Sequence, residues 1–182
     1  MARLEGRRST KTLWIFCEGK TEKAYFDKLK FTERISRLRI RPFQSHHTNA
    51  DGIIQEARKF IATNKDFQKG DMITCVFDRD SNTNEQLSKA DTLGAKNDII
   101  LSFSNPCFEY WILCHYGYFP NSFENDDLIG KISEVLGKYY KNDFNLYVHT
   151  KDKISVALKN AEKIKNYHLS KRRSLISRES NP

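Results

Sequence analysis

The chain has 182 residues, of which 38% are hydrophobic and 12% aromatic, so it can bury one substantial core and is not a wholly disordered chain. Lysine and arginine together number 31 against 23 aspartate and glutamate residues, and the resulting net charge of +8 points toward a polyanionic partner. No apolar run approaches the roughly 18 residues that a membrane-spanning helix needs. We therefore expect a soluble globular protein with no membrane partner.

Short apolar runs alternate with segments of helical spacing over the first 115 residues. Three continuous apolar runs, each typical of a buried strand, lie at 13–17, 72–77 and 99–104. A fourth segment, 38–41, alternates like a strand with one solvated side, and Pro42 follows it. The helices that follow the four strands are predicted to begin near Thr21, Asp51, residue 83 and Pro106, and Gly94 is predicted to end the third.

This order of strands and helices predicts the fold class. Strand followed by helix, repeated four times, is typical of an α/β domain whose sheet is mainly parallel and of Rossmann type, flanked by helices. Residues 125–140 and 151–167 predict two further, C-terminal helices. We expect one domain at 12–182, preceded by a basic N-terminal arm at 1–11.

The four cysteines form no CxxC pair, so their spacing supports neither a zinc ribbon nor a redox motif. We expect four reduced thiols in or near the core of a cytoplasmic protein. The residues are Cys17, Cys75, Cys107 and Cys114.

Acidic side chains follow two of the predicted strands. Glu18 comes directly after the run at 13–17, and Asp78 and Asp80 follow the run at 72–77 as the sequence FDRD. Ligands of parallel α/β sheets gather at the carboxyl ends of the strands, and alternate residues of an extended segment point to the same side. Three carboxylates there predict a Mg²⁺ site for phosphodiester chemistry, with Mn²⁺ as an alternative ion. Turns also favour aspartate, and for Asp80 taken alone that simpler explanation would suffice.

The residues after Glu18 extend this candidate site. Gly19 lets a backbone or a phosphate approach closely, although an ordinary turn glycine is an equal alternative. Lys20 is a candidate phosphate contact, but Gly19-Lys20-Thr21 is not a P-loop because Trp14 stands where that motif needs glycine. Glu22 either supports the site from the first turn of the helix or only interacts favourably with the helix dipole.

Asn105 and Glu109 lie near the end of another strand and could touch the substrate or orient a ligand. For Asn105 a simple capping role is slightly favoured. For Glu109 it is not, because its apolar neighbours would make an unpartnered carboxylate costly.

Basic residues are the candidate contacts to a nucleic-acid backbone, either DNA or RNA. They occur in the N-terminal arm, beside the predicted strands and near the C-terminus, and any one of them taken singly is more simply a solvated side chain. The candidates are Arg39, Arg41, Arg79, Arg172 and Arg173.

Three segments carry a resemblance to a known family. Glu18-Gly19 and Asp78-x-Asp80 after hydrophobic strands resemble the Toprim pattern of topoisomerases, bacterial primases and OLD-type nucleases. More specifically, CEGKTEKAYF (17–26), VFDRD (76–80) and SNPCFEYWILCHY (104–116) resemble the RloB-like family, the AbiLii type of phage-resistance protein. The resemblance covers roughly residues 12–182.

The resemblance implies a Toprim-like fold and a role in bacterial phage defence beside a partner ATPase. It also implies that Glu18 acts as general acid or base or joins metal binding, while Asp78 and Asp80 hold Mg²⁺. The expected function is therefore Mg²⁺-dependent hydrolysis of DNA or RNA in an abortive-infection system. The alternative is a catalytically silent nucleic-acid-binding or regulatory subunit of the defence ATPase.

Overall fold

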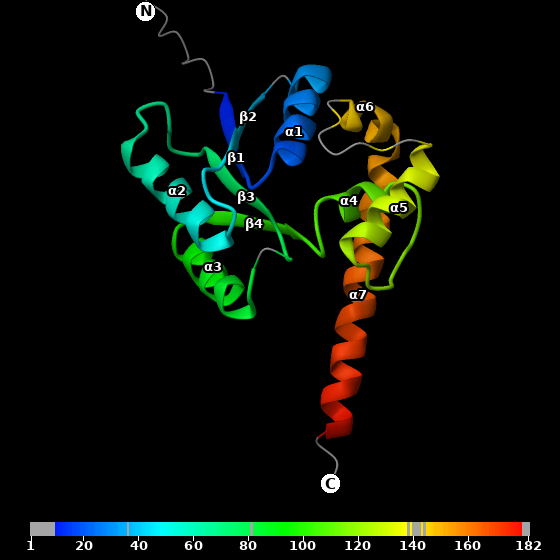
Figure 1. The fold of residues 1–182 in the computed structure, drawn as a ribbon. Coiled ribbons are helices and arrows are strands. Elements are labelled where there is room, and N and C mark those ends of the chain that lie inside the picture. The colour runs from blue at the N-terminus through cyan, green and yellow to red at the C-terminus, as the bar shows by residue number, and fades with distance from the viewer. Residues whose placement is uncertain are drawn as a thin grey trace, which may run out of the picture.

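The computed structural model describes residues 10–35, 37–80, 82–137, 139, 143 and 145–179, with side chains of the last helix described as far as Lys171. Four strands form one sheet in the order β2-β1-β3-β4, and every neighbouring pair is parallel (Figure 1). The strands are β1 (Lys11–Cys17), β2 (Leu38–Gln44), β3 (Met72–Asp78) and β4 (Ile99–Ser104). The predicted α/β class with a parallel sheet is confirmed.

A helix follows each strand, as predicted: α1 (Lys20–Glu33), α2 (Ala50–Thr63), α3 (Asn84–Lys96) and α4 (Glu109–Cys114). The C-terminal part contains α5 (Asn125–Leu136), α6 (Leu146–Thr150), the 3₁₀ turn η1 (Lys151–Lys153) and α7 (Ile154–Glu179). The short helix α6 was not predicted, and α7 runs beyond the predicted end at 167 and projects past the rest of the described chain (Figure 1).

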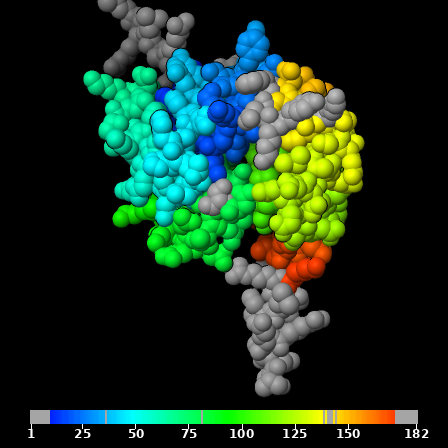
Figure 2. All heavy atoms as spheres, in the orientation of Figure 1, coloured from blue at the N-terminus to red at the C-terminus, as the bar shows by residue number. Residues whose placement is uncertain are grey.

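The two faces of the sheet are covered by different helices, because alternate residues of the central strands point to opposite sides. Ile15, Cys17 and Val76 belong to the core shared with α1, α4, α5 and α6. Trp14 and Phe77 belong to the core shared with α2 and α3. Figure 2 shows the sheet side, blue to green, packed against the C-terminal helices, yellow to orange. The central strands β1 and β3 are buried on both faces, which explains their continuous apolar runs.

The four cysteines are buried and free, in agreement with the expected reduced thiols. Burial raises the pKa of the Cys114 thiol to about 11, so it stays protonated near neutral pH.

The two edge strands differ in how their outer edges are protected. β2 carries Arg39, Arg41 and Pro42, which are residues that discourage pairing with another strand. β4 carries no charge, and Ile100 and Phe103 are 54% and 56% exposed. The strand predicted at 99–104 is present, but its predicted burial was wrong, because β4 ends the sheet and the described helices leave part of it uncovered.

Several helix boundaries differ from the predictions, including the end of α5 at Leu136 instead of 140 and the start of α7 at Ile154 instead of 151. The N-cap of α1 is Gly19 rather than Thr21, and that of α2 is Asn49 rather than Asp51, since the Asn49 side chain accepts the Gly52 N–H at 2.8 Å. Helix α4 begins at Glu109, three residues after Pro106. Helix α3 continues to Lys96 past Gly94, where a Cβ would lie 3.1 Å from the Ile99 carbonyl oxygen. None of the described helices has the length and apolar character needed to cross a membrane.

Candidate active site

A pocket of about 260 Å³ lies where the carboxyl ends of β1 and β3 meet the segment before α4 and the start of α5. Among the residues that the structure describes, five carboxylates line it, against a single ammonium group, that of Lys20. The carboxylates belong to Glu18, Glu22, Asp78, Asp80 and Glu109. Gly19 also lines the pocket. Of the residues that the sequence predicted for the site or its support, only Asn105 does not line this pocket.

Glu18 and Asp78 are joined directly across the two central strands. The backbone N–H of Glu18 donates to the Val76 carbonyl oxygen at 2.9 Å, so β1 continues its pairing with β3 to this point. The Glu18 carboxylate accepts the backbone N–H of Asp78, also at 2.9 Å. Burial, followed by the charges of Glu22 and Glu18, raises the pKa of Asp78 to about 8. A cation in the pocket would stabilise the ionised form of Asp78.

Glu22 lies in the first turn of α1 and is buried. Its carboxylate accepts hydrogen bonds from its own backbone N–H and from that of Gly19, so it occupies the helix N-terminus that the sequence left open to a phosphate. Burial and the nearby charges of Glu109 and Glu18 outweigh these bonds and raise the pKa of Glu22 to about 7. A Cβ at position 19 would lie 2.6 Å from Glu22 Oε2, so Gly19 is needed for this close packing.

Asp80 connects the sheet to the C-terminal helices. Its backbone N–H donates to the Pro106 carbonyl oxygen at 3.2 Å, and its carboxylate accepts the Asn125 Nδ2 amide at 2.6 Å. Asn125 is the first residue of α5, and its Oδ1 is buried with no hydrogen-bond partner in the part of the chain that the structure describes. Asn125 was not foreseen from the sequence, because it lies 45 positions after Asp80 and no spacing pattern links the two residues.

Glu109 is buried, and the Tyr139 hydroxyl donates to its Oε1 at 2.8 Å. The Tyr139 bond gives this buried carboxylate a partner within the fold, and the predicted contact of Glu109 with a substrate or ligand stays a prediction. Burial and the charge of Glu109 hold the pKa of Tyr139 above its usual range, so the phenol remains a hydrogen-bond donor.

Asn105 lies outside the pocket. It is exposed at the end of β4 and lines a different hollow, about 810 Å³ in volume. The Arg79 guanidinium donates to the Asn82 carbonyl oxygen and to Asn84 Oδ1 at the start of α3. The Arg79 side chain therefore stabilises the start of α3.

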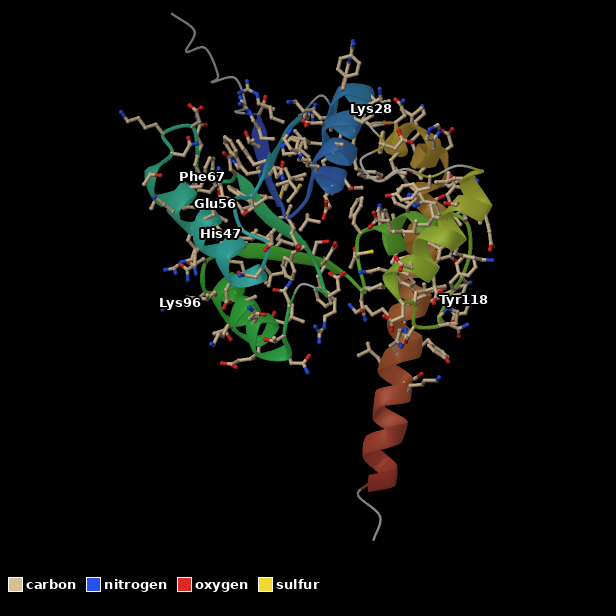
Figure 3. All side chains as sticks on the ribbon, in the orientation of Figure 1. Lys28, His47, Glu56, Phe67, Lys96 and Tyr118 are labelled. Atoms are coloured by element: carbon tan, nitrogen blue, oxygen red, sulfur yellow. The ribbon has the colours of Figure 1, made fainter. Side chains whose placement is uncertain are left out.

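Arg39 and Arg41 also lie apart from the carboxylates. Arg39 and Arg41 line a hollow between the end of α1 and the start of β2, and the Arg41 guanidinium lies 5.7 Å from the centre of the Trp14 ring. The side chains of Arg172 and Arg173 lie outside the described residues. His47 and Glu56 belong to the α2 side of the sheet (Figure 3).

The donors in the pocket are carboxylate oxygens and one unpartnered amide oxygen, a set that fits a hard cation such as Mg²⁺. Among the described residues, no three or more His, Cys, Asp or Glu side chains are arranged to hold one metal ion together. Mg²⁺ is usually bound by one or two carboxylates, with water and phosphate oxygens completing its shell. Glu18, Asp78 and Asp80 are the residues that could supply those carboxylates.

The fold and the pocket define an α/β protein with an acidic cleft at the carboxyl ends of a parallel sheet. The family model described as RloB-like protein matches residues 13–182, and the chain belongs to the RloB-like family. Comparisons with curated proteins and with solved structures gave no match.

Proposed function

We propose that this RloB-like chain is a Mg²⁺-dependent nuclease of Toprim type that hydrolyses phosphodiester bonds of DNA or RNA in bacterial phage defence. The observation that carries the proposal is the convergence of Glu18, Asp78 and Asp80 at the ends of β1 and β3, with Glu18 bound to the backbone of Asp78. A cytoplasmic location and a partner ATPase belong to the same proposal.

In this proposal Asp78 and Asp80 would hold Mg²⁺, or Mn²⁺ in its place, and Glu18 would move the proton of the attacking or leaving oxygen. The bound ion would polarise the phosphate and stabilise the charge that develops on it. Asn125 holds Asp80 in position through its amide group. Without a bound ion, Glu22 has a pKa of about 7 and is only partly ionised, which limits repulsion between the empty pocket and an approaching phosphate.

A second candidate is a catalytically silent nucleic-acid-binding or regulatory subunit of a defence ATPase. It is supported by the lack, among the residues that the structure describes, of any group of three side chains arranged to hold a metal ion. It is also supported by the hydrogen bond from Asn125 to the Asp80 carboxylate, because that bond gives Asp80 a role in the fold that needs no metal ion.

The experiment that separates the two candidates is a cleavage assay on supercoiled plasmid and on structured RNA. The purified chain is tested with Mg²⁺ or Mn²⁺, with and without the partner ATPase, and with EDTA. Cleavage that EDTA stops and that Asp78→Asn removes would support the nuclease. The matched control is Asp91→Asn, because Asp91 is an exposed aspartate of α3 outside the pocket. Failure to cleave under every condition would favour the regulatory subunit.

A further inference from the structure

The hollow that Asn105 lines is a groove between the edge strand β4, helix α4 and helix α7. Its volume of about 810 Å³ is that of a ligand site and about three times that of the carboxylate pocket. One wall is the outer strand of the sheet, which bears no charged residue and whose outer edge no described strand pairs. The other wall is the face of α7 around Ile164.

The charge of this groove is opposite to that of the pocket. None of the described residues that line the groove is Asp or Glu, whereas Lys165 and His168 of α7 lie along it. Its other polar groups are hydroxyls and amides, including Ser102, Ser104 and Asn105. Such a lining can accept phosphates and sugars without repulsion.

Aromatic rings in the groove are held rigidly with part of their surface exposed. Phe103 is 56% exposed and stacks on Phe77 on the α2–α3 side of the sheet edge, with ring centres 6.1 Å apart and planes 14° from parallel. The Trp111 indole N–H donates to the Tyr25 hydroxyl at 3.3 Å, and the Tyr110 hydroxyl donates to the Phe119 carbonyl oxygen at 2.5 Å. Fixed aromatic faces of this kind bind unstacked bases.

The groove and the pocket share one segment of chain. Asn105, Pro106 and Trp111 line the groove, whereas Cys107, Phe108 and Glu109 line the pocket. The Pro106 carbonyl oxygen also accepts the backbone N–H groups of Arg79 and Asp80, at 3.0 and 3.2 Å. The segment 105–109 therefore contributes to both hollows and is bonded to the backbone of Asp80 between them.

We propose that this groove binds single-stranded nucleic acid and leads it to the carboxylate pocket. The direction toward the pocket rests on the proposed function, whereas binding in the groove does not require cleavage. A single strand fits better than a duplex, because only unpaired bases can stack on Phe103. A single strand of nucleic acid also fits better than a polypeptide strand paired with β4. The α7 wall of the groove carries the cation Lys165, and the Phe103 ring is exposed.

The test is fluorescence anisotropy with a short labelled oligothymidylate, and with the same strand in a duplex, in EDTA so that no cleavage occurs. The wild-type chain should bind the single strand more tightly than the duplex. Phe103→Ala/Lys165→Gln should bind it about tenfold more weakly or worse, since both a stacking face and a cation are lost. The matched control, Phe31→Ala/Lys163→Gln, changes an exposed phenylalanine and a lysine of α7 that do not line the groove, and it should keep the wild-type affinity.

The Phe103→Ala change also removes the Phe77–Phe103 contact and could unfold the chain. A second pair of variants therefore measures binding with Phe103 left in place. Lys165→Glu should weaken binding more than Lys163→Glu, although both change the net charge equally. Equal effects of this pair, or equal affinity for duplex and single strand, would overturn the inference even if the chain cleaves nucleic acid. Protection of the β4 amides by a second polypeptide, with no oligonucleotide binding, would overturn it as well. If the chain shows the expected binding pattern but cleaves nothing, single-strand binding in the groove is supported and the proposed nuclease activity is disproved.

Discussion

The carboxylate of Glu18 accepts the backbone N–H of Asp78 at 2.9 Å, across 60 positions of the sequence. Through this bond, the acid that ends β1 is held against the first acid that ends β3. The pairing of β1 with β3 continues to the same point through the Glu18 N–H and the Val76 carbonyl oxygen. The bond orients Glu18 while leaving the Asp78 carboxylate itself in the pocket.

Isosteric changes at these two residues should separate chemistry from stability. Glu18→Gln and Asp78→Asn are each expected to abolish cleavage and to leave the melting temperature unchanged or slightly raised. Glu18→Gln removes one charge from a crowded group, and Asp78→Asn replaces a carboxyl that, without a bound ion, is already largely protonated near neutral pH. In the Glu18→Gln variant the side-chain amide oxygen can still accept the Asp78 N–H. Nuclease assays with parallel thermal melts provide the measurement. A large loss of stability would show that the carboxylate is required by the fold.

The stability of the metal-free protein should fall between about pH 5 and pH 8. Asp78 and Glu22 have pKa values raised to about 8 and about 7 in the folded state, so the folded chain holds protons that the unfolded chain releases. The stabilisation is fully present below the unfolded-state pKa and is lost as pH rises through the folded-state values. Each retained proton gives a slope of at most about 1.4 kcal/mol per pH unit.

Thermal melts in EDTA across this pH range measure that slope. Asp78→Asn/Glu22→Gln should flatten it, whereas Asp91→Asn, outside the pocket, should leave it as in the wild type. A wild-type slope in the double variant would assign the pH dependence to other groups.

Gly19 and Glu22 should be energetically coupled. Gly19→Ala is expected to destabilise the chain by about 1–3 kcal/mol, because its Cβ would lie 2.6 Å from Glu22 Oε2. In a Glu22→Ala background the same change should cost much less, since the clashing carboxylate is gone. Urea unfolding of the four proteins in this double-mutant cycle gives the coupling energy. Additive effects would mean that Gly19 is required for its backbone alone.

Removal of the Tyr139 hydroxyl should weaken the support of Glu109. Tyr139→Phe deletes the donor to a buried carboxylate and is expected to cost about 1–3 kcal/mol of unfolding free energy. Tyr118→Phe is the matched control, because Tyr118 is 44% exposed and lies on the C-terminal side of the molecule (Figure 3). The same loss in both variants would contradict a specific role for the Tyr139–Glu109 bond.

Nucleic-acid binding should weaken with salt, by roughly 0.7 to 0.9 log units per log unit of salt for each phosphate neutralised. Arg172→Ala/Arg173→Ala should weaken binding to unrelated sequences alike and make this slope shallower. Anisotropy across a salt series measures both effects. An affinity independent of salt would exclude direct phosphate contacts and leave the +8 charge to solubility or to a protein partner.

The order of strands and helices was predictable from the sequence, because buried strands and amphipathic helices have different periods of hydrophobicity. The runs that became β1 and β3 are apolar throughout since both faces of a central parallel strand are covered. Glu18 and Asp78 follow these two runs, and neighbouring parallel strands end at the same edge of a sheet. Their meeting in one pocket was therefore foreseeable.

Only the tertiary structure decided which residues support these acids. Asn125 reaches Asp80 and Tyr139 reaches Glu109 because the segments from α5 onward pack against the carboxyl end of the sheet. The exposure of β4 was decided in the same way: its sequence is as apolar as that of a central strand, but it is the last strand of the sheet. The periodicity of a segment depends on its own residues, whereas burial and side-chain pairing depend on the distant segments that fold against it.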